Sequence, residues 1–304
     1  TRGMWTQEQG KWIEDYIKRE VLPVISPIGL DPAHPFPRLV NKSLNFIVSL
    51  EGKDAFGRDT GLAIIPAPRS LPRLVELPQE LCDDQTCLVF LSSMIHANAH
   101  KLFPGMKVKG CYQFRITRNA DLNVNEDAKD LALALRGGLH SRRFGRAVRL
   151  EVADNCPEEL INFLLQEAGL TKDELYQVNG PVNLHRMMDV MNIVTRSELL
   201  YPPMTPAIPR GLGTKDSIFE TVSKKDYLLL HPYESFAPVI HFLQEAAKDP
   251  NVIAIKQTLY RTGSQSPIVG ALVEAARNGK EVTAVVELRA RFDEEDNLDL
   301  AALL

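Results

Sequence analysis

The sequence predicts an α+β domain with an antiparallel sheet, followed by the beginning of an α/β domain with a parallel sheet. Three observations predict this order. Several segments before residue 200 alternate apolar and polar residues, as half-buried antiparallel strands do. A segment rich in proline and glycine at 201–215 marks a domain boundary. Beyond it, short apolar runs alternate with helical patterns, which is typical of parallel βαβ units.

The first domain is predicted to begin with an amphipathic helix at residues 6–21, because Trp12, Tyr16 and Ile17 share one face with Val21. Prolines then end this helix and favour an extended loop at 31–38. The remaining elements are expected as strands at 43–50, 61–65, 74–77, 86–91, 108–117 and 146–152, and as helices at 94–99, 125–139 and 157–168.

Glycines are expected to end two of these helices. The pair Gly137-Gly138 follows the helical pattern at 125–139, and Gly169 follows the one at 157–168. Glycine adopts the left-handed conformation that commonly closes a helix, so we expect both helices to stop at these residues.

The second domain is predicted to alternate strands with helices. Strands are expected at 227–230, 252–259 and 282–288, and helices at 236–247 and 268–278, the latter closed by Gly279. The last four residues read as part of a further helix. Because only about ninety residues follow the boundary, we expect the sheet to continue beyond Leu304.

Composition narrows the class of protein. A hydrophobic content of 44% and a charged content of 24% are typical of a globular chain without a membrane span. The formal net charge of −4 argues against a general nucleic-acid-binding protein, but it permits a local site for a polyanion. The cysteines lack CxxC spacing, which favours reduced thiols in a cytoplasmic protein over a zinc site. The chain does not begin with methionine, which fits a fragment of a longer protein.

Two arginines are the strongest candidates for a binding site. Arg261 and Arg291 each follow a predicted strand, and they lie thirty residues apart, the length of one βαβ unit. Both should therefore emerge at the carboxyl edge of one parallel sheet, where open α/β sheets bind ligands. Two converging guanidinium groups favour a multiply charged anion such as phosphate.

The residues around Arg291 leave alternatives open. If the strand persisted past residue 288, Glu287, Arg289 and Arg291 would share one face of it. Asp293 and the two glutamates after it suit either Mg²⁺ binding or the start of a helix. We favour the helix start, with salt bridges from these acidic residues to the arginines.

Two further residues permit both a functional and a structural interpretation. Lys256 lies within a predicted strand, where an edge position explains it more simply than a ligand contact. His231 follows the predicted strand at 227–230, and the turn that begins the next helix explains it better than a catalytic role.

Seven motifs, in this order and at these separations, make the chain resemble the bacterial polyphosphate kinases that have two phospholipase D-like domains. The resemblance covers essentially the whole chain and rests on 23–28 (PVISPI), 31–37 (DPAHPFP), 149–152 (RLEV), 180–184 (GPVNL), 231–236 (HPYESF), 254–261 (AIKQTLYR) and 286–295 (VELRARFDEE).

The resemblance implies a domain order and a reaction. Residues 1–20 are similar to the end of an N-terminal helical domain, 21–205 to the head domain, and 206–304 to the truncated start of the first phospholipase D-like domain. The implied reaction is reversible transfer of the ATP γ-phosphate to polyphosphate through a phosphohistidine, with Mg²⁺. Arg261 and Arg291 match the family's Mg–nucleotide phosphate site. Because a guanidinium has no lone pair to offer a metal, they should act through phosphate oxygens.

The chain departs from the family in one decisive respect. The phosphorylated histidine of the family lies in a His-x-Lys motif, and no His-x-Lys occurs in these 304 residues. We therefore expect the nucleophile beyond Leu304, no catalytic residue within the chain, and no turnover by the fragment alone.

The implied partners are ATP or ADP and inorganic polyphosphate, with a homo-oligomer at full length. Two other functions stay open on the sequence. One is a non-enzymatic module for polyanion binding or oligomerisation, and the other is a phospholipase D-like enzyme acting on a phosphodiester. Peripheral association with a membrane is also left open.

Overall fold

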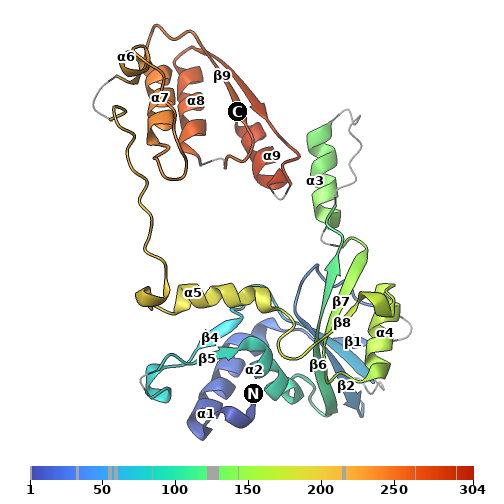
Figure 1. Cartoon of the computed structure of the whole chain (residues 1–304). Helices are drawn as coiled ribbons and strands as arrows, with labels where there is room; N and C mark the ends of the chain where they lie inside the picture. The colour runs from blue at the N-terminus through green and yellow to red at the C-terminus, as the bar shows by residue number, and fades with distance from the viewer. Residues whose placement is uncertain are drawn as a thin grey trace. The chain divides into compact units, whose positions relative to one another are not determined.

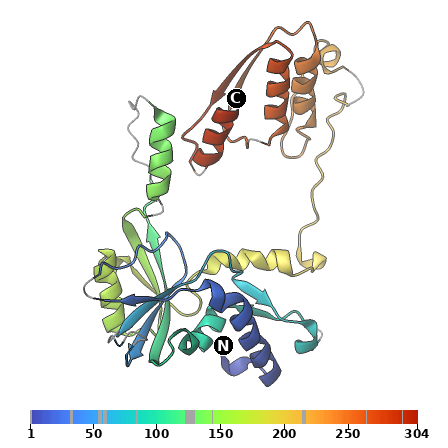
Figure 2. The same cartoon turned by 180° about the vertical axis from the view of Figure 1, so that it is seen from behind.

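The computed structural model describes residues 2–31, 34–53, 57, 61–83, 85–121, 130–142, 144–213, 217–263, 265–291 and 293–304. The chain divides into two compact units, drawn in Figures 1 and 2. Unit 1 comprises Thr1–Leu122 and His140–Arg196, and unit 2 comprises Asn123–Leu139 and Ser197–Leu304. Among the described helices, none is both long enough and apolar enough to cross a membrane.

A six-stranded sheet forms the centre of unit 1. Its order is β1-β3-β2-β6-β7-β8, and neighbouring strands run antiparallel except for the parallel pair β7 and β8. The sheet is therefore mixed, whereas the sequence predicted an antiparallel one. Its strands are β1 Ile28–Leu30, β2 Asn45–Glu51, β3 Leu62–Pro66, β6 Lys107–Arg118, β7 Ala147–Ala153 and β8 Leu175–Val178. A second, two-stranded sheet pairs β4 (Leu74–Glu76) with β5 (Leu88–Phe90).

Helices cover both faces of the six-stranded sheet. Figures 1 and 2 show α1 (Gln7–Tyr16) and α2 (Leu91–Asn98) on one side and α4 (Glu158–Ala168) on the other. Strand β2 contributes Phe46 and Val48 to the first core and Ile47 to the second, because successive side chains of a strand point to opposite faces. This double burial explains the apolar run from Phe46 to Val48 in the middle of β2.

Local sequence signals set the ends of these helices. Thr6 forms a capping box with Gln9 at the start of α1, and a π-helical turn (Ile17–Val21) and a 3-10 turn (Leu22–Val24) continue the helix to the prolines. Gly169 has φ of 64° and closes α4, as predicted. The other short helices of unit 1 are α5 (Val190–Ile193) and 3-10 turns at Arg2–Met4, Gln79–Leu81, Ala99–Leu102, Lys172–Glu174 and Leu184–Asp189.

Two sequence predictions in this region are wrong or incomplete. Helix α3 (Leu131–Arg142) runs through Gly137 and Gly138, neither of which has a positive φ. A glycine inside a helix costs only about 1 kcal/mol relative to alanine, so it does not compel a stop. The predicted start of this helix at 125 lies outside the described residues.

Strands β1 and β8 were not predicted, since three or four residues carry little periodicity.

Unit 2 contains a parallel pair of strands, β9 (Ala254–Leu259) and β10 (Glu281–Val286), joined by α8 (Pro267–Arg277). The helices that lie wholly within unit 2 also include α6 (Ile218–Val222), α7 (Ala237–Lys248) and α9 (Glu294–Leu303), and a 3-10 turn lies at Ser197–Leu199. Helix α3 belongs to unit 2 as far as Leu139. Its core joins α7, α8, α9 and β9 through Leu243, Leu272, Leu300 and Leu259. The predicted βαβ unit is therefore present.

The strand predicted at 227–230 is absent. Leu228 and Leu230 are 95% and 64% exposed, and the segment pairs with neither β9 nor β10. The side chain of Glu234 explains the difference, because it accepts a hydrogen bond of 2.8 Å from the Leu230 N–H. The Glu234 N–H in turn donates to the Leu230 carbonyl over 2.9 Å, so the chain turns here instead of extending.

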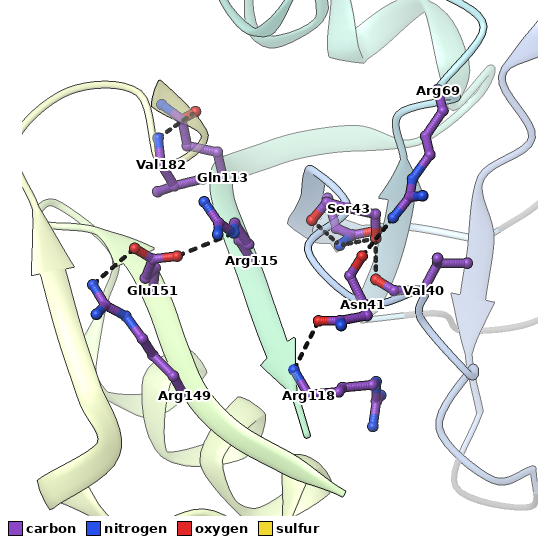
Figure 3. A network of polar contacts seen from close by, with 11 residues as sticks. Val40, Asn41, Ser43, Arg69, Gln113, Arg115, Arg118, Arg149, Glu151 and Val182 are labelled. Carbon is purple, nitrogen blue, oxygen red and sulfur yellow. Dashed lines mark hydrogen bonds and ion pairs between the residues drawn. The ribbon is translucent and has the colours of Figure 1, made fainter. Parts of the chain in front are cut away.

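A buried charge network links two strands of the unit 1 sheet (Figure 3). The Glu151 carboxylate on β7 lies 3.2 Å from Nε of Arg115 on β6 and 2.9 Å from Nη2 of Arg149. The Arg149 guanidinium also lies 3.8 Å from the centre of the Tyr176 ring on β8. Two guanidinium groups on β6 and β7 therefore share one carboxylate, and Arg149 also contacts β8.

We expect Glu151→Gln to destabilise unit 1 by about 3 kcal/mol, because it leaves two cations in a largely buried site without their counter-charge. Chemical denaturation followed by circular dichroism measures this loss. Lys172→Gln is the matched control, since the Lys172–Glu158 pair is exposed and its removal should leave the midpoint unchanged. Equal midpoints for Glu151→Gln and the unsubstituted chain would contradict the assignment.

A second carboxylate joins α6 to α7 in unit 2. Glu245 accepts hydrogen bonds from the Ser217 hydroxyl and, over 2.9 Å, from the Ile218 N–H, and these bonds lower its pKa. A pKa below that of the unfolded chain contributes stability above the ordinary value of 4.5, and this contribution disappears as the pH falls through the folded pKa. Unfolding curves of Glu245→Gln and the unsubstituted chain should therefore differ at pH 7 and converge toward pH 3. A difference independent of pH would contradict this role.

Candidate functional site

The parallel pairing in unit 2 brings the ends of two strands to one edge. The register runs from Ala254 opposite Glu281 to Leu259 opposite Val286, and the Glu287 N–H extends it by donating to the Leu259 carbonyl over 3.1 Å. The segments that carry Arg261 and Arg291 therefore both begin at the carboxyl edge of the pair. This is the arrangement that the thirty-residue spacing predicted.

Asn297 on α9 fastens both segments to the helix. Its side-chain amide donates to the Tyr260 carbonyl over 2.9 Å and to the Glu287 carbonyl over 2.6 Å. The residue is only 1% exposed, so these bonds are shielded from water. Sequence reasoning missed Asn297. No local pattern marked it, because Asn297 follows three acidic residues and its partners lie 37 and 10 residues away in the sequence.

The guanidinium of Arg261 is held at this edge by two contacts. Its Nε lies 3.1 Å from Oδ2 of Asp293, and its Nη2 donates to the Arg291 carbonyl over 3.1 Å. The guanidinium carbon also lies 5.4 Å from the centre of the Tyr260 ring. About half of the Arg261 side chain is exposed, so it is oriented and still accessible to a ligand. These contacts engage two of the five N–H donors that a guanidinium carries.

Arg291 is exposed, and its backbone carbonyl receives the Arg261 guanidinium. The two arginine positions are therefore adjacent, as the spacing predicted. The shared strand face of Glu287, Arg289 and Arg291, which required the strand to persist past residue 288, is not formed. Strand β10 ends at Val286, and Glu287 and Arg289 lie in a turn where the Glu287 carboxylate accepts from the Arg289 N–H over 3.1 Å. The Asn297 amide binds the Glu287 carbonyl and diverts the chain from an extended path.

The acidic residues after Phe292 begin a helix, as we favoured over a metal site. Helix α9 starts at Glu294, with Glu295 and Asp296 in its first turn, where negative charge is favoured. Asp293 precedes the helix but makes no side-chain cap hydrogen bond. Its carboxylate pairs with Arg261 instead, which confirms the expected salt bridge to an arginine.

The two ambiguous residues lie as the structural interpretations predicted. Lys256 is exposed in β9, so no buried charge requires explanation. His231 lies in the turn before α7, where its Nδ1 is 2.9 Å from the Glu234 carbonyl and its ring packs against Phe236. In the described part of the chain, no cluster of three or more His, Cys, Asp or Glu residues is arranged to hold a metal ion.

Comparison with known proteins assigns both units to one family. The description "Polyphosphate kinase middle domain" matches residues 8–190, and "Polyphosphate kinase C-terminal domain 1" matches residues 217–304. The chain belongs to the polyphosphate kinase family. Polyphosphate kinases of Pseudomonas aeruginosa, Pseudomonas syringae pv. tomato and Neisseria meningitidis serogroup A are 65%, 63% and 56% identical to it over all 304 residues. The resemblance that the sequence motifs indicated is confirmed.

A solved polyphosphate kinase has the same fold. The crystal structure of polyphosphate kinase from Porphyromonas gingivalis matches 98% of this chain with a TM-score of 0.76 and 27% sequence identity. The chain covers 42% of that structure and 44% of the Pseudomonas aeruginosa polyphosphate kinase. It thus spans less than half the length of these relatives.

Replacing Asn297 with alanine should destabilise unit 2 by about 2–3 kcal/mol, because two shielded carbonyl groups lose their donor. Hydrogen exchange should also become faster at the amides that follow β9 and β10. Denaturation and exchange measurements check both effects. Asp296→Ala is the matched control on the exposed side of the same helix. If both variants behaved alike, Asn297 would not be the residue that holds the two segments.

Proposed function

We propose that the chain is part of an ATP:polyphosphate phosphotransferase that reversibly transfers the ATP γ-phosphate to inorganic polyphosphate through a phosphohistidine. One observation carries this proposal. In a chain that matches polyphosphate kinases along its whole length, Arg261 and Arg291 follow neighbouring parallel strands at one sheet edge. We assign the terminal phosphates of ATP to this edge.

Arg261 and Arg291 are proposed to hold those phosphates. Asp293 and the Arg291 carbonyl orient the Arg261 guanidinium group, and its other N–H donors are left to bind phosphate oxygens. Phosphoryl transfer depends mainly on positioning and on stabilising negative charge, and fixed guanidinium groups supply both. The exposed Arg291 adds a second positive charge from the adjacent turn.

Mg²⁺ is proposed to enter with the nucleotide. A guanidinium cannot ligate a metal, whereas Mg²⁺ commonly keeps several waters and binds substrate phosphates with one or two carboxylates. The residues at this edge fit that role, because the arginines bind the phosphates that carry the ion and Asp293 is engaged with Arg261. When bound, the ion would neutralise charge on the phosphate groups.

The nucleophile is proposed to belong to polypeptide outside these 304 residues. The chain contains no His-x-Lys motif and covers 44% of its Pseudomonas aeruginosa relative. We propose that residues 21–205 form the head domain and 206–304 the first part of a phospholipase D-like domain. We also propose that the whole enzyme is a cytoplasmic homo-oligomer. On this assignment the chain binds nucleotide but does not turn it over.

Arg261→Gln and Arg291→Gln should each weaken Mg–ATP binding by about tenfold to a hundredfold, because each removes charge-assisted hydrogen bonds to phosphate. Calorimetric titration of the 304-residue chain measures the affinity. Arg261→Lys should recover only part of it, since lysine keeps the charge but not the planar fork.

Arg277→Gln makes the same charge change at the C-terminal end of α8, away from the carboxyl edge of the strands, and should bind Mg–ATP as the unsubstituted chain does. Binding that survives in an Arg261→Gln/Arg291→Gln double variant would refute the proposed site. In the whole enzyme, an assay with ATP and polyphosphate should show activity that the same substitutions reduce.

A further inference from the structure

Arg73 is a buried cation in unit 1 that lacks a carboxylate partner. The residue is 7% exposed and directly precedes β4, where its carbonyl accepts from the Leu91 N–H over 2.9 Å. Its Nη2 donates to the Ala67 carbonyl over 3.1 Å, whereas its Nη1 is buried without a hydrogen-bond partner. Among the described residues, no Asp or Glu pairs with it.

The contrast with the neighbouring arginines makes Arg73 unusual. Arg115 and Arg149 share the Glu151 carboxylate, as Figure 3 shows. The charged groups that act on Arg73 are instead two other arginines. Burial first, and then the positive charges of Arg186 and Arg69, lower the pKa of Arg73 to about 10. It therefore stays protonated at neutral pH, as a buried charge without compensation, which is costly unless a ligand supplies an anion.

A pocket opens beside this guanidinium. The polar residues that line it are Arg73, Ser92, Gln113, Asn183 and Arg186, and the cavity has a volume of about 20 Å³, so one oxygen of an anion fits inside and the rest of the anion lies at its open mouth. The described lining includes no acidic residue and offers guanidinium, amide and hydroxyl donors. Such a set matches an anion with several acceptor oxygens.

The walls of the pocket are held in place from several elements. Gln113 on β6 donates to the Gly180 carbonyl over 3.3 Å. It also accepts from the Val182 N–H over 3.5 Å (Figure 3). Val182 is 3% exposed and belongs to the same core as β2. The segment that carries Asn183 and Arg186 is therefore anchored against the sheet at Val182.

We propose that this pocket binds a phosphate-type oxyanion, either free orthophosphate or one phosphate group of a polyphosphate chain. The buried Nη1 of Arg73 would donate to one oxygen, and Arg186 would bind the anion from the open side. The site lies wholly within unit 1. Binding of free orthophosphate is independent of the function proposed above, and binding of a polyphosphate group rests on it.

Calorimetric titration of the 304-residue chain with orthophosphate and, separately, with tripolyphosphate tests the proposal. Each titration uses an Arg261→Gln/Arg291→Gln background, so that the site in unit 2 does not contribute. We expect saturable binding of one or both anions, and the two titrations show which source of phosphate the pocket takes. Absence of saturable binding for both anions would overturn the proposal, whether or not Mg–ATP binds at the site in unit 2.

Two variants locate the binding. Arg73→Met removes the buried charge at similar volume, and Arg186→Gln alters an exposed residue that should not affect folding. Each should weaken binding of the anion by about tenfold or more, because a charge-assisted hydrogen bond is lost. Arg19→Gln, an exposed arginine outside the pocket, should leave binding unchanged. Binding that is unaffected by both pocket variants would place the anion elsewhere and overturn the assignment.

Thermal unfolding separates a ligand-binding role from a structural one. The anion should raise the melting temperature of the parent chain and leave that of Arg73→Met unchanged, because a ligand stabilises only the folded state that binds it. If Arg73 served packing alone, Arg73→Met would lower the melting temperature equally with and without the anion. That result would also overturn the proposal.

Discussion

The parallel hydrogen bonds between β9 and β10 bring two chain segments, thirty residues apart in sequence, to one edge of a sheet. Each strand ends where its partner ends, so the following residues begin side by side. The Asn297 amide then replaces strand pairing at the point where pairing stops, by binding one carbonyl from each segment. The position of Arg261 relative to Arg291 depends on both steps. A slip of the register would separate them, even if each strand were intact.

The arginines described above differ in how far a carboxylate compensates their charge, and this difference corresponds to their roles. Arg115 and Arg149 share the carboxylate of Glu151 and link strands of the sheet. Arg261 is partly neutralised by Asp293, which orients the guanidinium and leaves half of the side chain exposed. Arg73 is buried without a counter-charge among the described residues. The count of positive charges is therefore a poor guide to anion binding, and the distribution of carboxylates around them is a better one.

Periodicity and helix-ending signals predicted most of the longer elements. The alternation in β2 and β6, the glycine that closes α4 and the βαβ unit of unit 2 are all local features, which the sequence displays directly. The failures have a different origin. The segment at 227–230 has the composition of a strand, but the Glu234 side chain binds its backbone. The end of β10 and the role of Asn297 likewise depend on hydrogen bonds between segments distant in sequence, which periodicity does not contain.

Strand β2 has a consequence for how unit 1 loses its structure. Because Phe46 and Val48 pack on one side and Ile47 on the other, one strand contributes residues to both hydrophobic cores. Neither layer of helices can detach without exposing a strand that the other layer also covers. We therefore expect the two cores to unfold together, and a change that displaces β2 on one side to affect the packing on the other.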